Sequence, residues 1–131
     1  MTNIRIKKGQ RFEKWVAEFL RKRNHIVDIA HRKVIRIGDK YIFKGGDFFG
    51  CFDLISISAE GEITFIQATT HKDWKKDIEK MKEILRRQNS YEIEIWQKVE
   101  SGKVKVYRYN QYQDIDRDKG FELLFEVGRR K

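Results

Sequence analysis

The hydrophobic positions of the chain follow two different periods, and the first of them is helical. In the segment RFEKWVAEFLRKR, apolar residues recur every three to four positions, which is the spacing of a helix with one buried face. This pattern predicts an amphipathic helix from about residue 9 to residue 24. A second helical stripe follows Thr70, a candidate N-terminal cap, with Asp73 in the first turn. Its apolar members are Trp74, Ile78, Met81 and Leu85.

Elsewhere, apolar and polar residues alternate with the period of two that is typical of strands. HIVDI and KVIRI are predicted to be extended, and YIF follows after a turn at GDK. FDLISIS and EITFIQAT predict a hairpin around AEGE, with strands at about 52–58 and about 62–68. YEIEIWQKV and KVKVYRY predict two more strands across ESGK, and the tail GFELLFEVGRRK is interpreted as a strand with a frayed basic end.

The order of these elements predicts the fold class. A helix is followed by three or four strands, a second helix and two or three further strands, which favours an α/β domain with one mixed sheet flanked by helices. A chain of 131 residues is long enough for one domain with its own core. We therefore predict a single domain over residues 1–131, with a core at about 8–110 and a C-terminal extension at about 111–131.

The charge balance favours a polyanionic partner. The chain has 29 basic and 20 acidic residues, for a net charge of +9, so DNA is the first candidate. The candidate phosphate contacts are Arg21, Lys22, Arg23, Arg32 and Lys33, although each cluster fits an ordinary solvated face equally well. A single cysteine and the absence of a long apolar run or signal peptide predict a cytoplasmic protein with no membrane partner.

Polar residues interrupt the predicted hairpin at one of its ends. Asp53 lies near the start of the first strand, and Gln67 and Thr69 lie near the end of the second, where they share one face. A tight turn brings these strand ends together. A carboxylate, an amide oxygen and the carbonyl of Ala68 form a set of hard oxygen ligands suited to Mg²⁺, and Glu13 could add a second carboxylate. The alternative is that each of these polar groups has an ordinary structural role.

The residues Gly9, Glu13, Asp53 in CFDLISI and the strand end FIQAT occur in a familiar order. Over roughly residues 8 to 88, the chain resembles the PD-(D/E)xK nuclease superfamily, within it the archaeal Holliday junction resolvases and the methylation-dependent restriction endonucleases. The resemblance implies a restriction-endonuclease-like αβββαβ core and Mg²⁺- or Mn²⁺-dependent hydrolysis of phosphodiesters in DNA, with branched or modified DNA as candidate substrates. It also implies catalytic roles for Glu13, Asp53 and Gln67.

The sequence departs from the family pattern at Thr69, where the family has a lysine that positions the attacking water and steadies charge in the transition state. Lys72, at the start of the predicted helix, is a candidate replacement that would swing its amine back into the site. Otherwise the domain is a catalytically inactive, nuclease-fold DNA-binding module. A third alternative is a basic interaction protein that forms a homodimer, with its charge serving only solubility.

The loop DFFGCFD, from Asp47 to Asp53, contains an acid and two adjacent aromatic residues. It is similar to a loop with the pattern D-x-F-G-x-x-D found in phage and microbial proteins that also have a Gln-x-Thr strand. Asp47 is either functional or a common turn residue. Phe48 and Phe49 are interpreted either as a wedge against DNA bases or, more simply, as loop packing.

Overall fold

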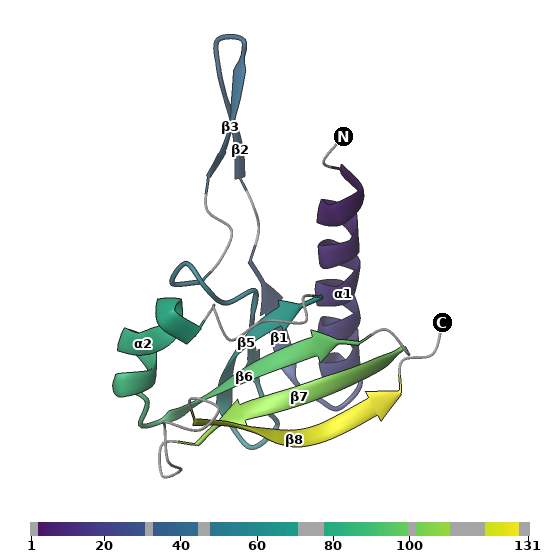
Figure 1. Cartoon of the computed structure of the whole chain (residues 1–131), viewed down its shortest axis with the longest axis vertical. Coiled ribbons are helices and arrows are strands. Elements are labelled where there is room, and N and C mark those ends of the chain that lie inside the picture. Colours follow the sequence, from purple (N-terminus) through teal and green to yellow (C-terminus); the bar gives the residue numbers. More distant parts are fainter. Residues whose placement is uncertain are drawn as a thin grey trace.

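The computed structural model describes residues 3–30, 33–44, 48–70, 78–99, 102–110 and 120–128, in which each of two helices is followed by a run of strands (Figure 1). The elements, in chain order, are α1 (Asn3–Arg21), β1 (Ile26–Ile29), β2 (Lys33–Ile37), β3 (Lys40–Lys44), β4 (Leu54–Ile57), β5 (Ile63–Thr69), α2 (Ile78–Arg86), β6 (Tyr91–Lys98), β7 (Lys103–Tyr109) and β8 (Phe121–Gly128).

Helix α1 begins earlier and ends earlier than its hydrophobic stripe predicts. It starts at Asn3 and is closed by Asn24, which has a φ of 67°. The backbone N–H of His25 donates to Leu20 O at 3.1 Å, and that of Asn24 donates to Arg21 O at 3.1 Å. This pair of hydrogen bonds around a left-handed asparagine is the Schellman arrangement that ends helices, so the chain turns directly into β1.

The main sheet has six strands in the order β1-β4-β5-β6-β7-β8. All neighbours are antiparallel except β5 and β6, which are parallel. Parallel neighbours need a long crossover connection, and here the segment between them contains α2. The prediction of an α/β domain with a mixed sheet is confirmed. The edge strand β8 comes from the segment that the sequence suggested as an extension.

Strands β2 and β3 form a separate two-stranded hairpin that projects away from the main sheet (Figure 1). Five strands therefore precede α2, where the alternation pattern predicted three or four. The pattern identified both segments as extended, but it contains no information on which partner each strand takes. The hairpin is inserted between β1 and β4, which pair with each other in the main sheet.

Two hydrophobic clusters lie on opposite faces of the sheet. On the α1 face, Val16 and Phe12 pack with Leu54, Ile66 and Trp96. The residues of the other cluster define the α2 face, and they are Ile78, Met81, Leu85, Phe52, Ile93, Ile95, Tyr109 and Phe121 with Cys51. Each helix therefore covers a different face, which makes this a three-layer domain as the sequence predicted.

Gly120, at the entry of β8, lies close to the buried ring of Tyr109. Its φ is +82°, and an added Cβ would lie 2.6 Å from Cε1 of Tyr109, whose side chain is buried. We expect Gly120→Ala to lower the free energy of unfolding by about 2–3 kcal/mol, through left-handed strain combined with this clash. Urea denaturation measures the loss.

A matched control is Gly61→Ala, because Gly61 has a similar φ of +87° but open space around the added Cβ. Gly61→Ala should lower the free energy of unfolding by the strain contribution alone, about 1 kcal/mol. Equal losses for the two variants would show that contact with Tyr109 is not what requires glycine at position 120.

Candidate functional site

Asp53 is held between β1 and β5, immediately before β4 begins. Its backbone N–H donates to Ile66 O at 2.8 Å, and its carbonyl accepts from the N–H of Ala30 at 2.8 Å. Its carboxylate Oδ2 accepts a hydrogen bond from the N–H of Ala68 at 2.9 Å. The carboxylate thus takes the place of a backbone partner at the end of β5. The structure brings Asp53 to the segment containing Gln67, Ala68 and Thr69.

The carbonyl of Ala68 faces the same edge of β5 as the Asp53 carboxylate. In a strand, the N–H and C=O of one residue point to the same side, as the two bonds exchanged by a hydrogen-bonded residue pair show. The N–H of Ala68 points toward Asp53. The carbonyl oxygen of Ala68 therefore points to the same side of β5, beyond the first residue of β4. Two oxygen donors, one of them a carboxylate, therefore meet at this edge.

Gln67 adds a buried amide oxygen to the same strand end. Ile66 and Ala68 pack on the α1 face, so by alternation Gln67 points to the α2 face, as Phe65 does. Its Oε1 is buried and has no hydrogen-bond partner among the described residues. A buried polar group without a partner costs roughly 1–3 kcal/mol, and a bound ion or ligand is one of its standard explanations.

Thr69 lies at the end of β5, where the resemblance described above implies a lysine. It is buried and pairs in register with Gln97 of β6, which is buried too. Gln97 therefore brings a second amide to the α2 face beside the strand end. Sequence analysis did not identify Gln97, because Gln97 lies beside Thr69 only through the parallel pairing of β5 with β6. No local pattern in the sequence encodes that register.

Glu13 is half-buried on α1, and α1 packs against β1, β4 and β5 from the face opposite to Gln67. Glu13 therefore lies in a different layer from the side chain of Gln67. Lys72 and Asp47 lie outside the described residues. In the ranges that the structure does describe, no group of three or more acidic, histidine or cysteine side chains could hold a metal ion. The donor set at this edge therefore rests on Asp53 with amide and carbonyl oxygens.

The basic cluster Arg21–Arg23 lies at the other end of the domain. Arg21 Nη2 donates to Val27 O at 2.9 Å, and Arg23 Nη1 donates to Phe19 O at 3.1 Å. The guanidinium of Arg23 also lies over the Phe19 ring, 3.5 Å from its centroid. These residues are near the start of β1, whereas Asp53 is near its end. The structure does not bring this cluster to Asp53.

Two basic segments extend from the end of the sheet that contains Asp53. The β2–β3 hairpin leaves the sheet after β1, and the N-terminal half of α1 projects in the same direction (Figure 1). The basic residues in these segments are Lys33, Arg36, Lys40 and Lys44 in the hairpin, and Arg5, Lys7, Lys8, Arg11 and Lys14 in α1. Arg32 lies outside the described residues. The sequence thus places many basic residues in these two elements.

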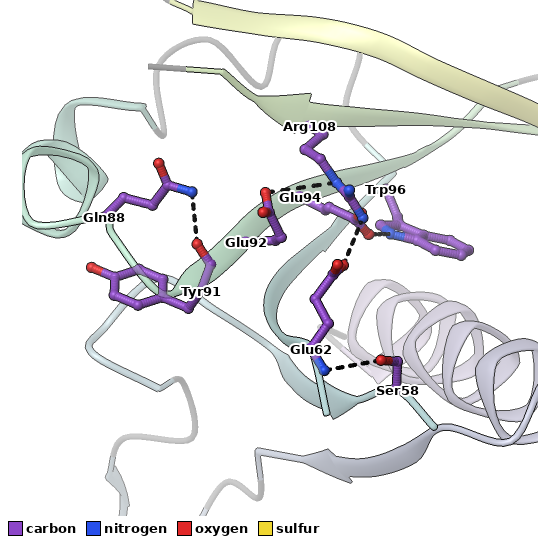
Figure 2. Close-up of polar contacts among 8 residues, drawn as sticks. All are labelled: Ser58, Glu62, Gln88, Tyr91, Glu92, Glu94, Trp96 and Arg108. Atoms are coloured by element: carbon purple, nitrogen blue, oxygen red, sulfur yellow. Dashed lines mark hydrogen bonds and ion pairs between the residues drawn. The ribbon is translucent and has the colours of Figure 1, made fainter. Parts of the chain in front are cut away.

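A second polar cluster surrounds Glu94 on the α1 face (Figure 2). Glu94 is 5% exposed and accepts hydrogen bonds from Trp96 Nε1 at 2.9 Å and from Arg108 Nε and Nη2 at 2.9 and 2.7 Å. Arg108 also forms ion pairs with Glu62 at 3.2 Å and with Glu92 at 3.9 Å. The pairing satisfies a carboxylate that would be costly to bury alone.

The charges in this cluster change the proton affinity of its members. Burial lowers the pKa of Arg108, but the attraction and hydrogen bond of Glu94 outweigh it, so the net direction is upward. Burial raises the pKa of Glu92, and Arg108 offsets part of that shift. Glu62 lies just before β5 and Arg108 near the end of β7, so the cluster is displaced toward the strand ends opposite Asp53. We assign it a structural role.

No protein-family model, curated protein or solved structure matches the chain. The functional argument therefore rests on the residues and geometry described above. Within the described residues, none of the helices combines the length and the apolar character needed to cross a bilayer.

Proposed function

We propose that the protein is a metal-dependent DNA endonuclease of the restriction-endonuclease-like type, with branched or modified DNA as candidate substrates. The observation that carries the proposal is the Asp53 carboxylate bound to the N–H of Ala68, one residue from the buried Oε1 of Gln67, which has no hydrogen-bond partner in the described part of the chain. In support, the order α1, β1, β4, β5, α2, β6 is compatible with the αβββαβ core that the resemblance implies, with β2–β3 as an insertion.

The residues at this edge fit a hard divalent cation. Asp53, the carbonyl of Ala68 and Glu13 would hold Mg²⁺ or Mn²⁺, and Gln67 Oε1 would be an additional donor. Such an ion supplies an activated water and stabilises charge on the phosphodiester. The N–H of Ala68 orients the carboxylate through its hydrogen bond to Oδ2. Lys72 is the proposed cation in place of Thr69.

DNA binding is the part of this proposal that charge supports most directly. We expect affinity for duplex DNA to fall by about 10²–10³-fold between about 50 and 200 mM salt, as release of counterions from roughly five phosphates requires. Lys40→Gln, at the exposed turn of the β2–β3 hairpin, should lower the salt slope by about one. Fluorescence anisotropy with a labelled duplex at several salt concentrations measures both quantities.

Lys22→Gln is the matched control, because Lys22 is also exposed but lies at the far end of α1. Its salt slope should equal that of the wild type. A slope lowered by Lys22→Gln and not by Lys40→Gln would place the phosphate contacts on the opposite end of the domain. A wild-type affinity that does not depend on salt would contradict DNA binding altogether and favour the basic interaction protein.

The second candidate function is a nuclease-fold DNA-binding module without catalysis, and the observation that favours it is Thr69. A threonine in the position of the family lysine has no charge with which to stabilise a transition state. Incubation of supercoiled and branched DNA with Mg²⁺ or Mn²⁺ separates the two candidates. Metal-dependent nicking supports the nuclease, and salt-dependent binding without nicking supports the module.

A further inference from the structure

A strained turn displays an aromatic side chain four residues before Asp53. The N–H of Phe48 donates to Phe52 O at 2.7 Å, and the N–H of Phe52 donates to Phe48 O at 3.0 Å. Between them, Phe49 has a φ of 56° and Gly50 a φ of 75°. Two successive positive φ angles favour glycine or asparagine, and a bulky residue in this conformation is an outlier. The closed turn nevertheless holds Phe49 there.

The side chain of Phe49 is also exposed, which packing does not explain. Phe49 is 69% exposed, whereas Phe52 and Cys51 in the same turn are buried at 0% and 5%. The ring of Phe49 contacts the ring of Phe65, with centroids 5.5 Å apart and an angle of 66° between planes. The turn thus buries its other apolar side chains in the α2-face cluster and leaves one aromatic face open to solvent.

The open ring lies on the same face of the sheet as the candidate site. Phe65, which it contacts, precedes Gln67 by two residues on β5, a distance of about 7 Å along a strand. The base of the turn at Phe52 continues directly into Asp53. Phe49 is therefore positioned next to the place where a DNA strand would enter the site.

We propose that Phe49 stacks on an unpaired or unstacked base of a DNA substrate bound at the Asp53 site, so that the preferred substrate contains single-stranded or distorted DNA. This proposal rests on the proposed function, because it uses the same site. An aromatic ring accepts the face of any base, which makes stacking a common way of holding single strands without sequence preference. The basic residues of β2–β3 supply the complementary charge for the backbone.

The experiment uses single-stranded, forked and fully paired DNA with 2-aminopurine, whose fluorescence is quenched on stacking, in the presence of EDTA so that no cleavage occurs. Wild-type protein should quench the probe at an unpaired position. Phe49→Ala should abolish the quench and weaken binding of single-stranded and forked DNA by about tenfold or more, with duplex binding unchanged. Phe49→Trp should retain both the quench and the affinity for single-stranded and forked DNA.

Phe49→Asn provides a variant whose fold is secure, because asparagine tolerates a positive φ. It should raise the melting temperature and still lose the quench. Leu123→Ala on β8, a large apolar residue 52% exposed, is the control for general loss of surface hydrophobicity and should bind and quench as the wild type does.

Full quenching and unchanged single-strand affinity in both Phe49→Ala and Phe49→Asn would overturn the stacking proposal while leaving DNA binding and catalysis intact. Wild-type protein that binds no DNA in EDTA at low salt would overturn stacking together with the DNA-binding part of the proposed function. Stacking without metal-dependent cleavage would leave Phe49 as a recognition residue of a binding module.

Discussion

Asp53→Ala is expected to reduce metal-dependent DNA cleavage by at least about 10³-fold, while most of the DNA affinity remains. The carboxylate of Asp53 is hydrogen-bonded to Ala68 of β5, beside Gln67. Its loss removes the main negative charge available to a divalent cation. Binding should persist because the basic residues lie on other elements. Nicking of supercoiled plasmid in Mg²⁺ or Mn²⁺ measures cleavage, and anisotropy in EDTA measures binding.

Two control variants make this result specific. Asp53→Asn keeps an oxygen that can accept the hydrogen bond from Ala68, so it should fold normally and still lose cleavage. Asp28→Ala removes an exposed acid from the neighbouring strand β1 and should cleave as the wild type does. Full cleavage by Asp53→Asn would show that the charge at this position is not needed, and the metal site would then be wrong.

Thr69→Lys tests whether the candidate site can cleave DNA once position 69 has a lysine. If the wild type binds DNA without cleaving it, introducing at this position the lysine that the resemblance implies should create detectable Mg²⁺-dependent nicking, because the lysine would supply a positive charge for the transition state. The double variant Asp53→Ala with Thr69→Lys is the control and should remain inactive. Nicking by this double variant would indicate a contaminating nuclease or a site elsewhere in the protein.

Glu94→Ala is expected to lower the free energy of unfolding by about 3–5 kcal/mol, because it leaves the guanidinium of Arg108 partly buried without its main partner. The side chains of Arg108 and Glu94 are 31% and 6% exposed, and Glu94 also accepts from the indole of Trp96. Its removal therefore takes away the acceptor of three N–H donors, Trp96 Nε1 and the Nε and Nη2 of Arg108, and opens a cavity in the α1 face. Urea denaturation at neutral pH, followed by tryptophan fluorescence, measures the change.

The neighbouring ion pair of Arg108 gives the matched control. Glu62 is 48% exposed, so Glu62→Ala should cost less than about 1 kcal/mol, as solvent-exposed pairs do. The double variant Glu94→Leu with Arg108→Met should recover much of the loss, because an apolar pair of similar volume removes the unpaired charge. A small effect of Glu94→Ala would contradict a structural role for this cluster.

Local sequence patterns determined most of the elements, because amphipathic periods are properties of neighbouring residues. The stripe of α1, the alternating strands β6 and β7 and the hairpin of β4 and β5 were all predicted at nearly their observed positions. The hairpin also explains why Asp53 could be expected beside residues 67–69. A short turn sets the register of two strands, so it brings the start of one next to the end of the other.

Element ends were predicted less well, since they depend on single residues. The left-handed conformation of Asn24 ends α1 three residues before the limit that the charged segment RKR suggested. Similarly, the sequence offered both a wedge and simple packing for Phe49. It did not predict the positive φ or the exposure of this residue in the closed turn, on which our stacking proposal rests.

Long-range pairing was decided by the tertiary structure alone. The parallel register of β5 and β6 places Gln97 beside Thr69. The antiparallel register of β6 and β7 places Arg108 opposite Glu94. Strands β2 and β3 pair with each other outside the main sheet and so form a projecting basic hairpin. Each of these contacts joins residues whose own sequence neighbourhoods specify only an extended strand. The choice among possible partners follows from burying two apolar faces at once, one under α1 and one under α2, which is a property of the whole chain.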